Sequence, residues 1–124
     1  MDKTTLAQVT AYLREHPSTF LATVAGQEPW VRAMWVARID DDGTLWYATG
    51  LHSNKVMQIR QNPHISVAGG EGQHGIRLFG IAEIVIDPAL KAALWEDTWT
   101  AYFAGKDDPN LALLKITPTR LEVW

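Results

Sequence analysis

The segment YATGLHSNKV, residues 47–56, gathers hydroxyl groups and a cation where a predicted strand gives way to a helix. Thr49, Ser53 and Lys55 lie close together there, and the segment contains no carboxylate. A helix N-terminus presents unpaired N–H groups and a partial positive charge, which favour an anion by about 0.3–1 kcal/mol. Charge-assisted hydrogen bonds to phosphate are stronger than neutral ones. The segment therefore predicts an anion site, and the alternative is an ordinary N-cap at Ser53 beside a solvated lysine.

Arg32 is a second candidate for the same site. Its segment, PWVRAMWVARID, predicts a strand that pairs with Trp46–Thr49 across the hairpin turn DDDG. This pairing would bring Arg32 to the end of the sheet where Ser53 lies. A guanidinium matches phosphate geometry, and the alternative is an arginine that extends along a sheet edge into water. The predicted phosphate site consists of Arg32, Thr49, Ser53 and Lys55, with Met34 and Trp35 as adjoining apolar surface.

Length, charge and composition exclude several classes of protein. A chain of 124 residues predicts one domain, residues 1–124, and its net charge of −3 with no basic tract argues against nucleic-acid binding. The absence of cysteine excludes disulfides, thiolate catalysis and zinc–sulfur sites. No apolar run approaches the roughly 20 residues of a membrane span, and the N-terminal segment has no signal-peptide pattern. We therefore expect a cytoplasmic protein without a membrane partner.

Tryptophan is unusually frequent. The chain contains six, and Trp30, Trp35 and Trp46 lie near one another in the sequence. Tryptophan combines a large flat apolar surface with one polar N–H group. These residues therefore predict either packing in the core and a dimer interface or an aromatic wall beside a planar ligand.

The N-terminal half predicts one helix, three strands and a second, short helix. TTLAQVTAYLREH has the apolar spacing of an amphipathic helix, capped by Thr4 or Thr5 and ended before Pro17. STFLATVAG, PWVRAMWVARID and TLWYAT follow as strands. The short helix runs from Ser53 to about Gln61 and ends at Asn62-Pro63.

The C-terminal half predicts four further strands and one long helix. HISVAGG and GIRLFGIAEIVID are strands around a glycine-rich loop. Asp87 caps and Pro88 opens a helix that we expect to reach about Phe103 and to stop at Gly105. LALLKITP and TRLEVW then form two short strands.

This order of elements predicts a mainly β fold, an antiparallel β-barrel with flanking helices. Strands joined by tight turns favour antiparallel pairing, and a sheet that curls into a small barrel removes exposed edges. A Rossmann fold is disfavoured, because no G-x-G-x-x-G follows the first strand and helices do not alternate with strands.

The ordered motifs resemble a known family. FLATVAGQEPWVRAMWVARIDDDGTLWYATGLHSNKVMQIRQNPHISV is similar to the N-terminal half of the pyridoxamine 5′-phosphate oxidase-like, FMN-binding split β-barrel proteins. The shared features are the L-A-T strand, Pro-x-x-Arg, the D-G hairpin and T-x-x-x-S-x-K before a helix. GIAEIVID and KDDPNLALLKITPTRLEVW are most similar to the general-stress-protein subgroup.

The resemblance implies a homodimer that holds FMN in clefts between its subunits. It implies that Arg32, Ser53 and Lys55 bind the FMN phosphate and that Ala33, Met34 and Trp35 run beside the ribityl chain and ring. Ala48 and Thr49 would close the other side. The implied cofactor-binding residues are Arg32, Ala33, Met34, Trp35, Ala48, Thr49, Ser53, Asn54, Lys55 and Trp124, the last reaching the ring from the partner chain.

Departures from the family pattern argue against oxidation of pyridoxamine phosphate. The oxidases carry a substrate-binding lysine where this chain has Ala37, and Asn54 replaces a residue that is often basic. A glutamine that approaches the flavin corresponds to Gly75, and the chain ends at Trp124 without the substrate-binding extension.

Two functions remain open from the sequence. The first is a flavin-dependent oxidoreductase of unknown substrate, in which bound FMN carries the redox chemistry of a small molecule. The second is a non-catalytic flavin-storage or stress protein, and a related ligand (haem or a deazaflavin) is a further alternative. His52, His64 and His74 lack helix-face spacing and a carboxylate partner, so we expect no metal site.

Overall fold

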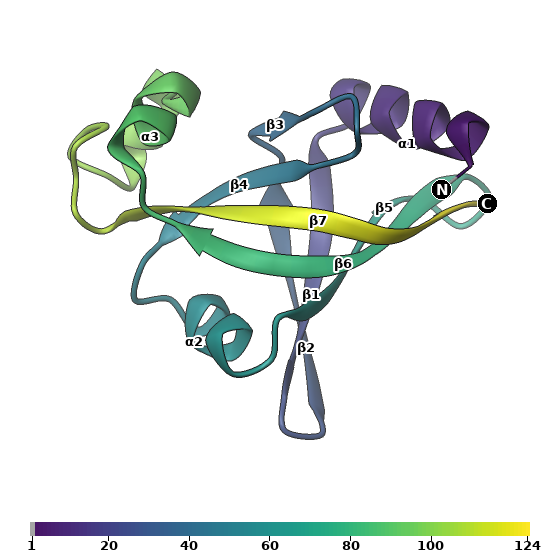
Figure 1. Ribbon diagram of the computed structural model, residues 1–124, viewed down its shortest axis with the longest axis horizontal. Helices are drawn as coiled ribbons and strands as arrows, with labels where there is room; N and C mark the ends of the chain where they lie inside the picture. Colours follow the sequence, from purple (N-terminus) through teal and green to yellow (C-terminus); the bar gives the residue numbers. More distant parts are fainter. Residues whose placement is uncertain (1) are drawn as a thin grey trace.

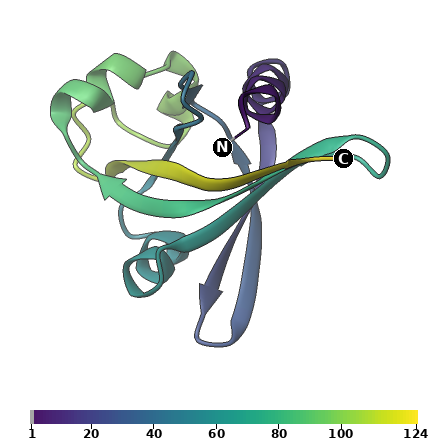
Figure 2. The ribbon, with the colours of Figure 1, turned by 45° about the vertical axis from the view of Figure 1, so that its right-hand side comes forward.

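One curled sheet of seven antiparallel strands organises the molecule (Figure 1). The computed structural model describes residues 2–124. The strands are β1 (Ser18–Ala25), β2 (Glu28–Trp35), β3 (Arg38–Ile39), β4 (Leu45–Gly50), β5 (His64–Gly70), β6 (Gly75–Val85) and β7 (Leu111–Val123). They lie in the order β2-β1-β5-β6-β7-β4-β3. The predicted mainly β, antiparallel barrel architecture is confirmed, and Figure 2 shows how the β1–β2 hairpin projects from the curled sheet.

Three α-helices and one 3₁₀ helix accompany the sheet. They are α1 (Lys3–Glu15), α2 (Asn54–Gln61), α3 (Pro88–Leu94) and η1 (Asp97–Ala101). The cap of α1 is Asp2, not Thr4 or Thr5 as predicted, because the Asp2 carboxylate accepts from the Thr4 N–H and the Thr5 hydroxyl, each at 3.0 Å. The predicted Asp87 cap of α3 is correct.

The hydrophobic core is formed by the sheet together with α1 and α2. Val9 and Leu13 of α1 are buried against strand residues that include Leu21, Tyr47 and Leu78. Thr19 makes two polar contacts inside the core, since its hydroxyl hydrogen-bonds to the Met34 carbonyl at 2.8 Å and to the Tyr47 hydroxyl at 2.6 Å. The core thereby fixes the backbone of β2 against β1 and β4.

The predicted pairing of Arg32 with β4 is wrong. β2 pairs with β1, where Leu21 lies opposite Arg32, and the short β3 pairs with β4 instead. The chain leaves β2 at Val36, whose N–H donates to Pro17 O, and turns at Ala37, whose N–H donates to Trp46 O. PWVRAMWVARID is thus two strands, and β2 becomes an edge of the sheet.

The predicted long helix after Asp87 is also wrong, because it is broken into α3 and η1. Trp95 is extended (φ −52°, ψ 135°) and ends α3. Its indole packs edge-on against Trp99, with ring centroids 5.6 Å apart, and Trp99 contacts the second core cluster around Leu94 and Leu113. Burial of these side chains therefore overrides the helical preference of the segment.

The last predicted pair of strands is one continuous strand, β7. Pro118 lies inside it, opposite Gly80, where the register of β6 shifts between Phe79 and Gly80. Proline removes a ladder hydrogen bond and is tolerated at such irregularities. A Cβ on Gly80 would lie 2.6 Å from the Thr117 carbonyl oxygen, so the close approach of the two backbones requires glycine.

Gly80→Ala should therefore destabilise the fold. We expect a loss of about 1–3 kcal/mol in the free energy of unfolding, because the new methyl group meets backbone that cannot move freely. Gly72→Ala is the matched control, since nothing lies within 4 Å of a Cβ there. Equal unfolding midpoints in urea for the two variants would contradict the close approach of the β6 and β7 backbones at Gly80.

Candidate functional site

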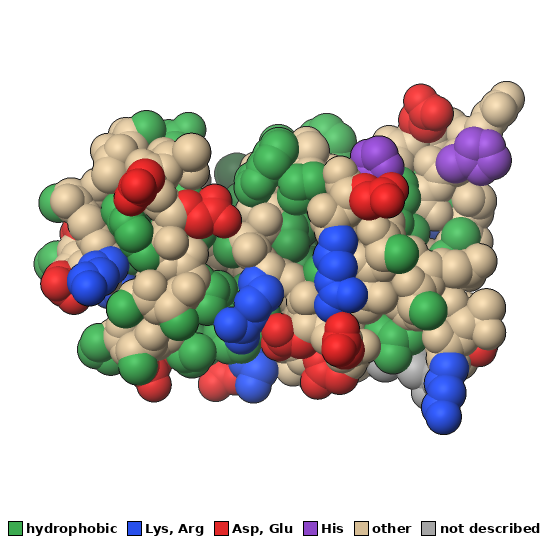
Figure 3. Space-filling model, turned by 90° about the horizontal axis from the view of Figure 1, so that it is seen from above, with side chains coloured by type: hydrophobic (Ala, Val, Ile, Leu, Met, Phe, Trp, Pro, Cys, Tyr) green, Lys and Arg blue, Asp and Glu red, His purple; other side chains and the backbone are tan. Residues whose placement is uncertain are grey.

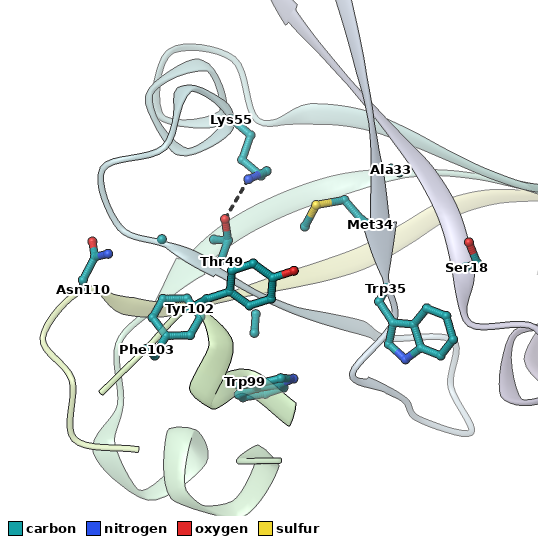
Figure 4. Close-up of a pocket in the computed structure, with 12 residues that line it drawn as sticks. Ser18, Ala33, Met34, Trp35, Thr49, Lys55, Trp99, Tyr102, Phe103 and Asn110 are labelled. Carbon is teal, nitrogen blue, oxygen red and sulfur yellow. Dashed lines mark hydrogen bonds between the residues drawn. The ribbon is translucent and has the colours of Figure 1, made fainter. Parts of the chain in front are cut away.

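A pocket of about 620 Å³ opens where β2, β4 and the segment after η1 approach one another (Figure 4). Apolar and aromatic groups dominate its lining, as in most small-molecule sites. The lining residues are Ser18, Ala33, Met34, Trp35, Ala48, Thr49, Gly50, Lys55, Trp99, Tyr102, Phe103 and Asn110. Six of them, Ala33, Met34, Trp35, Ala48, Thr49 and Lys55, are among the residues predicted from the sequence.

The strand-to-helix junction supplies the polar end of the pocket. The Lys55 ammonium donates to the Thr49 hydroxyl at 2.9 Å, and the Thr49 and Ser53 hydroxyl oxygens lie 3.4 Å apart. Ser53 occupies the N-cap position of α2, but its side chain makes no capping hydrogen bond. Its hydroxyl therefore lies beside the helix N-terminus, although Ser53 is not among the lining residues of the pocket. Asn54 is the first residue of α2 and does not line the pocket.

Arg32 lies near this end of the pocket because two residues that were not predicted, Thr23 and Gln58, hold its guanidinium. Its guanidinium donates to the Thr23 hydroxyl at 2.8 Å and to the Gln58 side-chain oxygen at 2.9 Å. Thr23 and Gln58 are buried and hydrogen-bond to each other. Gln58 lies three residues after Lys55 on α2, so the two side chains share one face of the helix. This spacing is visible in the sequence and could have identified Gln58 as a neighbour of the site. α2 thus connects both cations, although Arg32 itself does not line the pocket.

The two cations lack acidic partners. Within residues 2–124, no carboxylate lies in salt-bridge distance of Arg32 or Lys55. Burial, and secondarily the charge of Arg32, lowers the pKa of the Lys55 ammonium below its ordinary 10.5. Burial also lowers the pKa of Arg32. An anion bound between them would relieve both effects.

Aromatic residues that the sequence analysis missed form the other side of the pocket. Trp99, Tyr102 and Phe103 come from η1 and the residues that follow it. The segment WEDTWTAYF is rich in aromatic residues, and this could have indicated a binding surface. In the continuous helix that was predicted, however, these rings would not be expected to gather at one cleft. Their position follows from the break at Trp95.

Trp124 does not reach the pocket of its own chain. Its indole N–H donates to Glu71 O at 3.1 Å, and the Arg77 guanidinium lies 5.1 Å from the ring centroid. The backbone groups of Trp124 and Gly75 hydrogen-bond to each other, which holds the C-terminal residue at the β5–β6 hairpin (Figure 1). Contact of Trp124 with a site in a partner chain stays a prediction.

Nucleic-acid, metal and membrane binding would each require a particular feature of the described residues. On the face shown in Figure 3, Lys and Arg side chains of the described residues are interspersed with Asp and Glu and form no continuous basic patch. No group of three His, Cys, Asp or Glu suited to a metal ion exists among residues 2–124. In the same part of the chain, no helix has the length and apolar character needed to cross a bilayer.

The curled antiparallel sheet with a polar junction at one strand end defines the class as the split β-barrel type. The chain belongs to the pyridoxamine 5′-phosphate oxidase family, whose sequence pattern matches residues 5–124. The resemblance seen in the sequence motifs is therefore confirmed.

Relatives place the chain near the general stress proteins of that family. It is 32% identical to general stress protein 26 of Bacillus subtilis (strain 168) over 111 residues, which cover 86% of this chain and 78% of that protein. The crystal structure of general stress protein 26 from Bacillus anthracis strain Sterne superimposes with a TM-score of 0.84 at 26% identity, covering 98% of this chain and 92% of that one. The general stress FMN/FAD binding protein of Xanthomonas citri shares the fold (TM-score 0.84, 23% identity, 99% and 89% covered).

The environment of Lys55 predicts a pH dependence of stability. Its pKa is lower in the folded chain than in the unfolded chain. Between the two values the unfolded chain binds more protons, so this group makes the free energy of unfolding rise with pH across that interval and up to about pH 10.5. In Lys55→Met the contribution should disappear.

The measurement is urea unfolding of the wild type and Lys55→Met at a series of pH values from neutral upward. The exposed Lys106, changed to methionine, is the control. The wild-type curve minus the Lys55→Met curve should slope upward with pH, and parallel curves would contradict the burial of this ammonium.

Proposed function

We propose that the chain binds FMN in this pocket and serves as a flavin-dependent oxidoreductase. The observation that carries the proposal is the pair of cations, Arg32 and Lys55, which have no carboxylate partner among the described residues and adjoin two hydroxyl groups. A phosphate monoester matches this donor set, because it neutralises both charges and accepts several hydrogen bonds. The flavin bound by the Xanthomonas citri relative supports the same ligand class.

The remaining predicted residues would hold the rest of FMN. Backbone groups of Ala33, Met34 and Trp35 would run beside the ribityl chain and ring, and Ala48 with Thr49 would close the opposite side. Asn54 would lie near the phosphate at the start of α2. The bound flavin would supply the capacity to accept and donate electrons, while the chain binds it, orients it and limits its exposure to water.

A homodimer would complete this site. Phe20, Val31 and Trp35 share one face of the β1–β2 hairpin, since Ala22 pairs with Val31, Phe20 with Ala33 and Ser18 with Trp35. All three side chains are exposed, Val31 by 67% and Trp35 by 65%. Ser18, Ala33 and Trp35 also line the pocket. We propose that a second copy covers this apolar face and thereby closes the pocket, with Trp124 of that copy approaching the ring.

Removing either cation should weaken FMN binding. Arg32→Ala and Lys55→Ala should each lose about 1.5–3 kcal/mol, or about 10- to 150-fold in Kd, because each removes a charge-assisted contact to phosphate. The measurement is titration with FMN while tryptophan fluorescence is followed. Arg60→Ala is the control, since Arg60 is an exposed residue in the last turn of α2. Unchanged affinity in both variants would refute the phosphate site.

Reduction of the FMN-loaded protein by NADH or NADPH tests the enzymatic part separately. Turnover faster than that of free FMN would support an oxidoreductase. Saturable binding with no such turnover would favour flavin storage and leave the binding site unaffected.

Val31→Glu should convert the dimer to a monomer. Two carboxylates would be buried at the apolar face, which costs several kcal/mol, whereas the monomer fold tolerates the change because Val31 is exposed. Sedimentation velocity measures the result, with Ile86→Glu as a control at an equally exposed apolar residue outside the hairpin. An unaltered dimer in Val31→Glu would exclude this face as the interface.

A further inference from the structure

An aromatic wall, defined as Trp99, Tyr102 and Phe103, lies across the pocket from Met34 and Trp35 (Figure 4). Tyr102 lines the pocket, yet 81% of it is exposed. The phosphate site at the other end of the pocket does not use these three rings. An exposed aromatic group beside an apolar cleft is a ready surface on which a flat ligand can stack.

The chain that follows the aromatic wall is held in place by a buried lysine. Lys91 on α3 is 6% exposed, and its ammonium donates to Asp108 O at 2.9 Å. The Asp108 carboxylate in turn accepts from the Ala104 and Asn110 N–H groups at 2.8 and 2.9 Å. These bonds fix the segment between Phe103 and β7 from both ends. The chain that leaves the wall is therefore held against α3 and cannot move freely away from the pocket.

The charges of the lining restrict which ligand can stack there. No Asp or Glu of the described chain lines the pocket, and Lys55 is the one charged lining residue. The phosphate of FMN would already neutralise Lys55. A further ligand with a net charge would have to leave water without a partner, which is unfavourable. Ser18 and Asn110 still offer hydrogen bonds to a neutral polar substituent.

We propose that the aromatic wall binds a neutral, planar aromatic compound as the second ligand of the pocket, stacked on Tyr102 beside the flavin, with Trp99 at its edge (Figure 4). This inference rests on the proposed function and deepens it by naming the class of substrate. Ring stacking supplies the affinity, and the uncharged lining supplies the selectivity against ions.

Three compounds with one ring system test the proposal: 2-naphthol, naphthalene-2-sulfonate and 2-naphthyltrimethylammonium. Each is titrated by calorimetry into the FMN-loaded wild-type protein near neutral pH. 2-Naphthol should bind saturably, and both ions should bind at least about fivefold more weakly, because their charges find no partner. Preferred binding of the trimethylammonium compound would mean that the wall is a cation site of the aromatic-cage type and would overturn the proposal.

Tyr102→Ala is the decisive variant, because so exposed a side chain can be removed without loss of the fold. Its Kd for 2-naphthol should rise about three- to tenfold, the range expected for the loss of one aromatic contact. Its Kd for FMN should stay unchanged, and Ile86→Ala, at another exposed apolar residue, should alter neither. An unchanged Kd for 2-naphthol in Tyr102→Ala would overturn the proposal. So would a Tyr102→Ala protein that sediments as a monomer, since the wall would then be a subunit contact.

The FMN titration distinguishes failure of this inference from failure of the proposed function. FMN binding without 2-naphthol binding would overturn this inference alone and leave the proposed function standing. A wild-type protein that does not bind FMN would overturn both.

Discussion

Two positive charges, with no carboxylate of residues 2–124 in salt-bridge distance, are the constraint on which the candidate site depends. Arg32 comes from the edge strand β2 and Lys55 from the first turn of α2. Buried Thr23 and Gln58 satisfy part of the Arg32 guanidinium, while Thr49 accepts from Lys55. Because these partners are neutral, they do not compensate the two positive charges. Burial of Lys55 and the nearby charge of Arg32 disfavour the protonated ammonium and so lower its pKa.

The curled sheet makes this arrangement possible. β1 lies between β2 and β5 and carries both Thr23, which contacts the Arg32 guanidinium, and Thr19, which fixes the Met34 carbonyl and the Tyr47 hydroxyl. Curling brings β2 and β4 to opposite sides of one pocket, although they are far apart in the strand order. Hydrogen bonds from two threonines of β1 thus position Met34 on the apolar side of the pocket and Arg32 at its polar end.

The third side of the pocket depends on two features of the segment between β6 and β7. The break at Trp95 turns the chain so that Trp99 packs against Trp95 and the second core cluster. The buried Lys91 and the Asp108 carboxylate then hold the chain that follows. An exposed aromatic surface is consequently kept beside a cleft that contains no acidic group among its described lining residues.

The sequence by itself determined the positions of most strands, the bounds of α2, the Asp87 cap and half of the residues that line the pocket. These features are local, because alternation of apolar residues, turn chemistry and capping each act over a few positions. Only the tertiary structure decided the partner of β2, the break of the helix at Trp95, the continuity of β7 through Pro118 and the position of Trp124 at the β5–β6 hairpin. Each of these depends on contacts with residues that are distant in the sequence. Such contacts can override the local preference for a helix or strand, and the neighbouring residues alone do not indicate them.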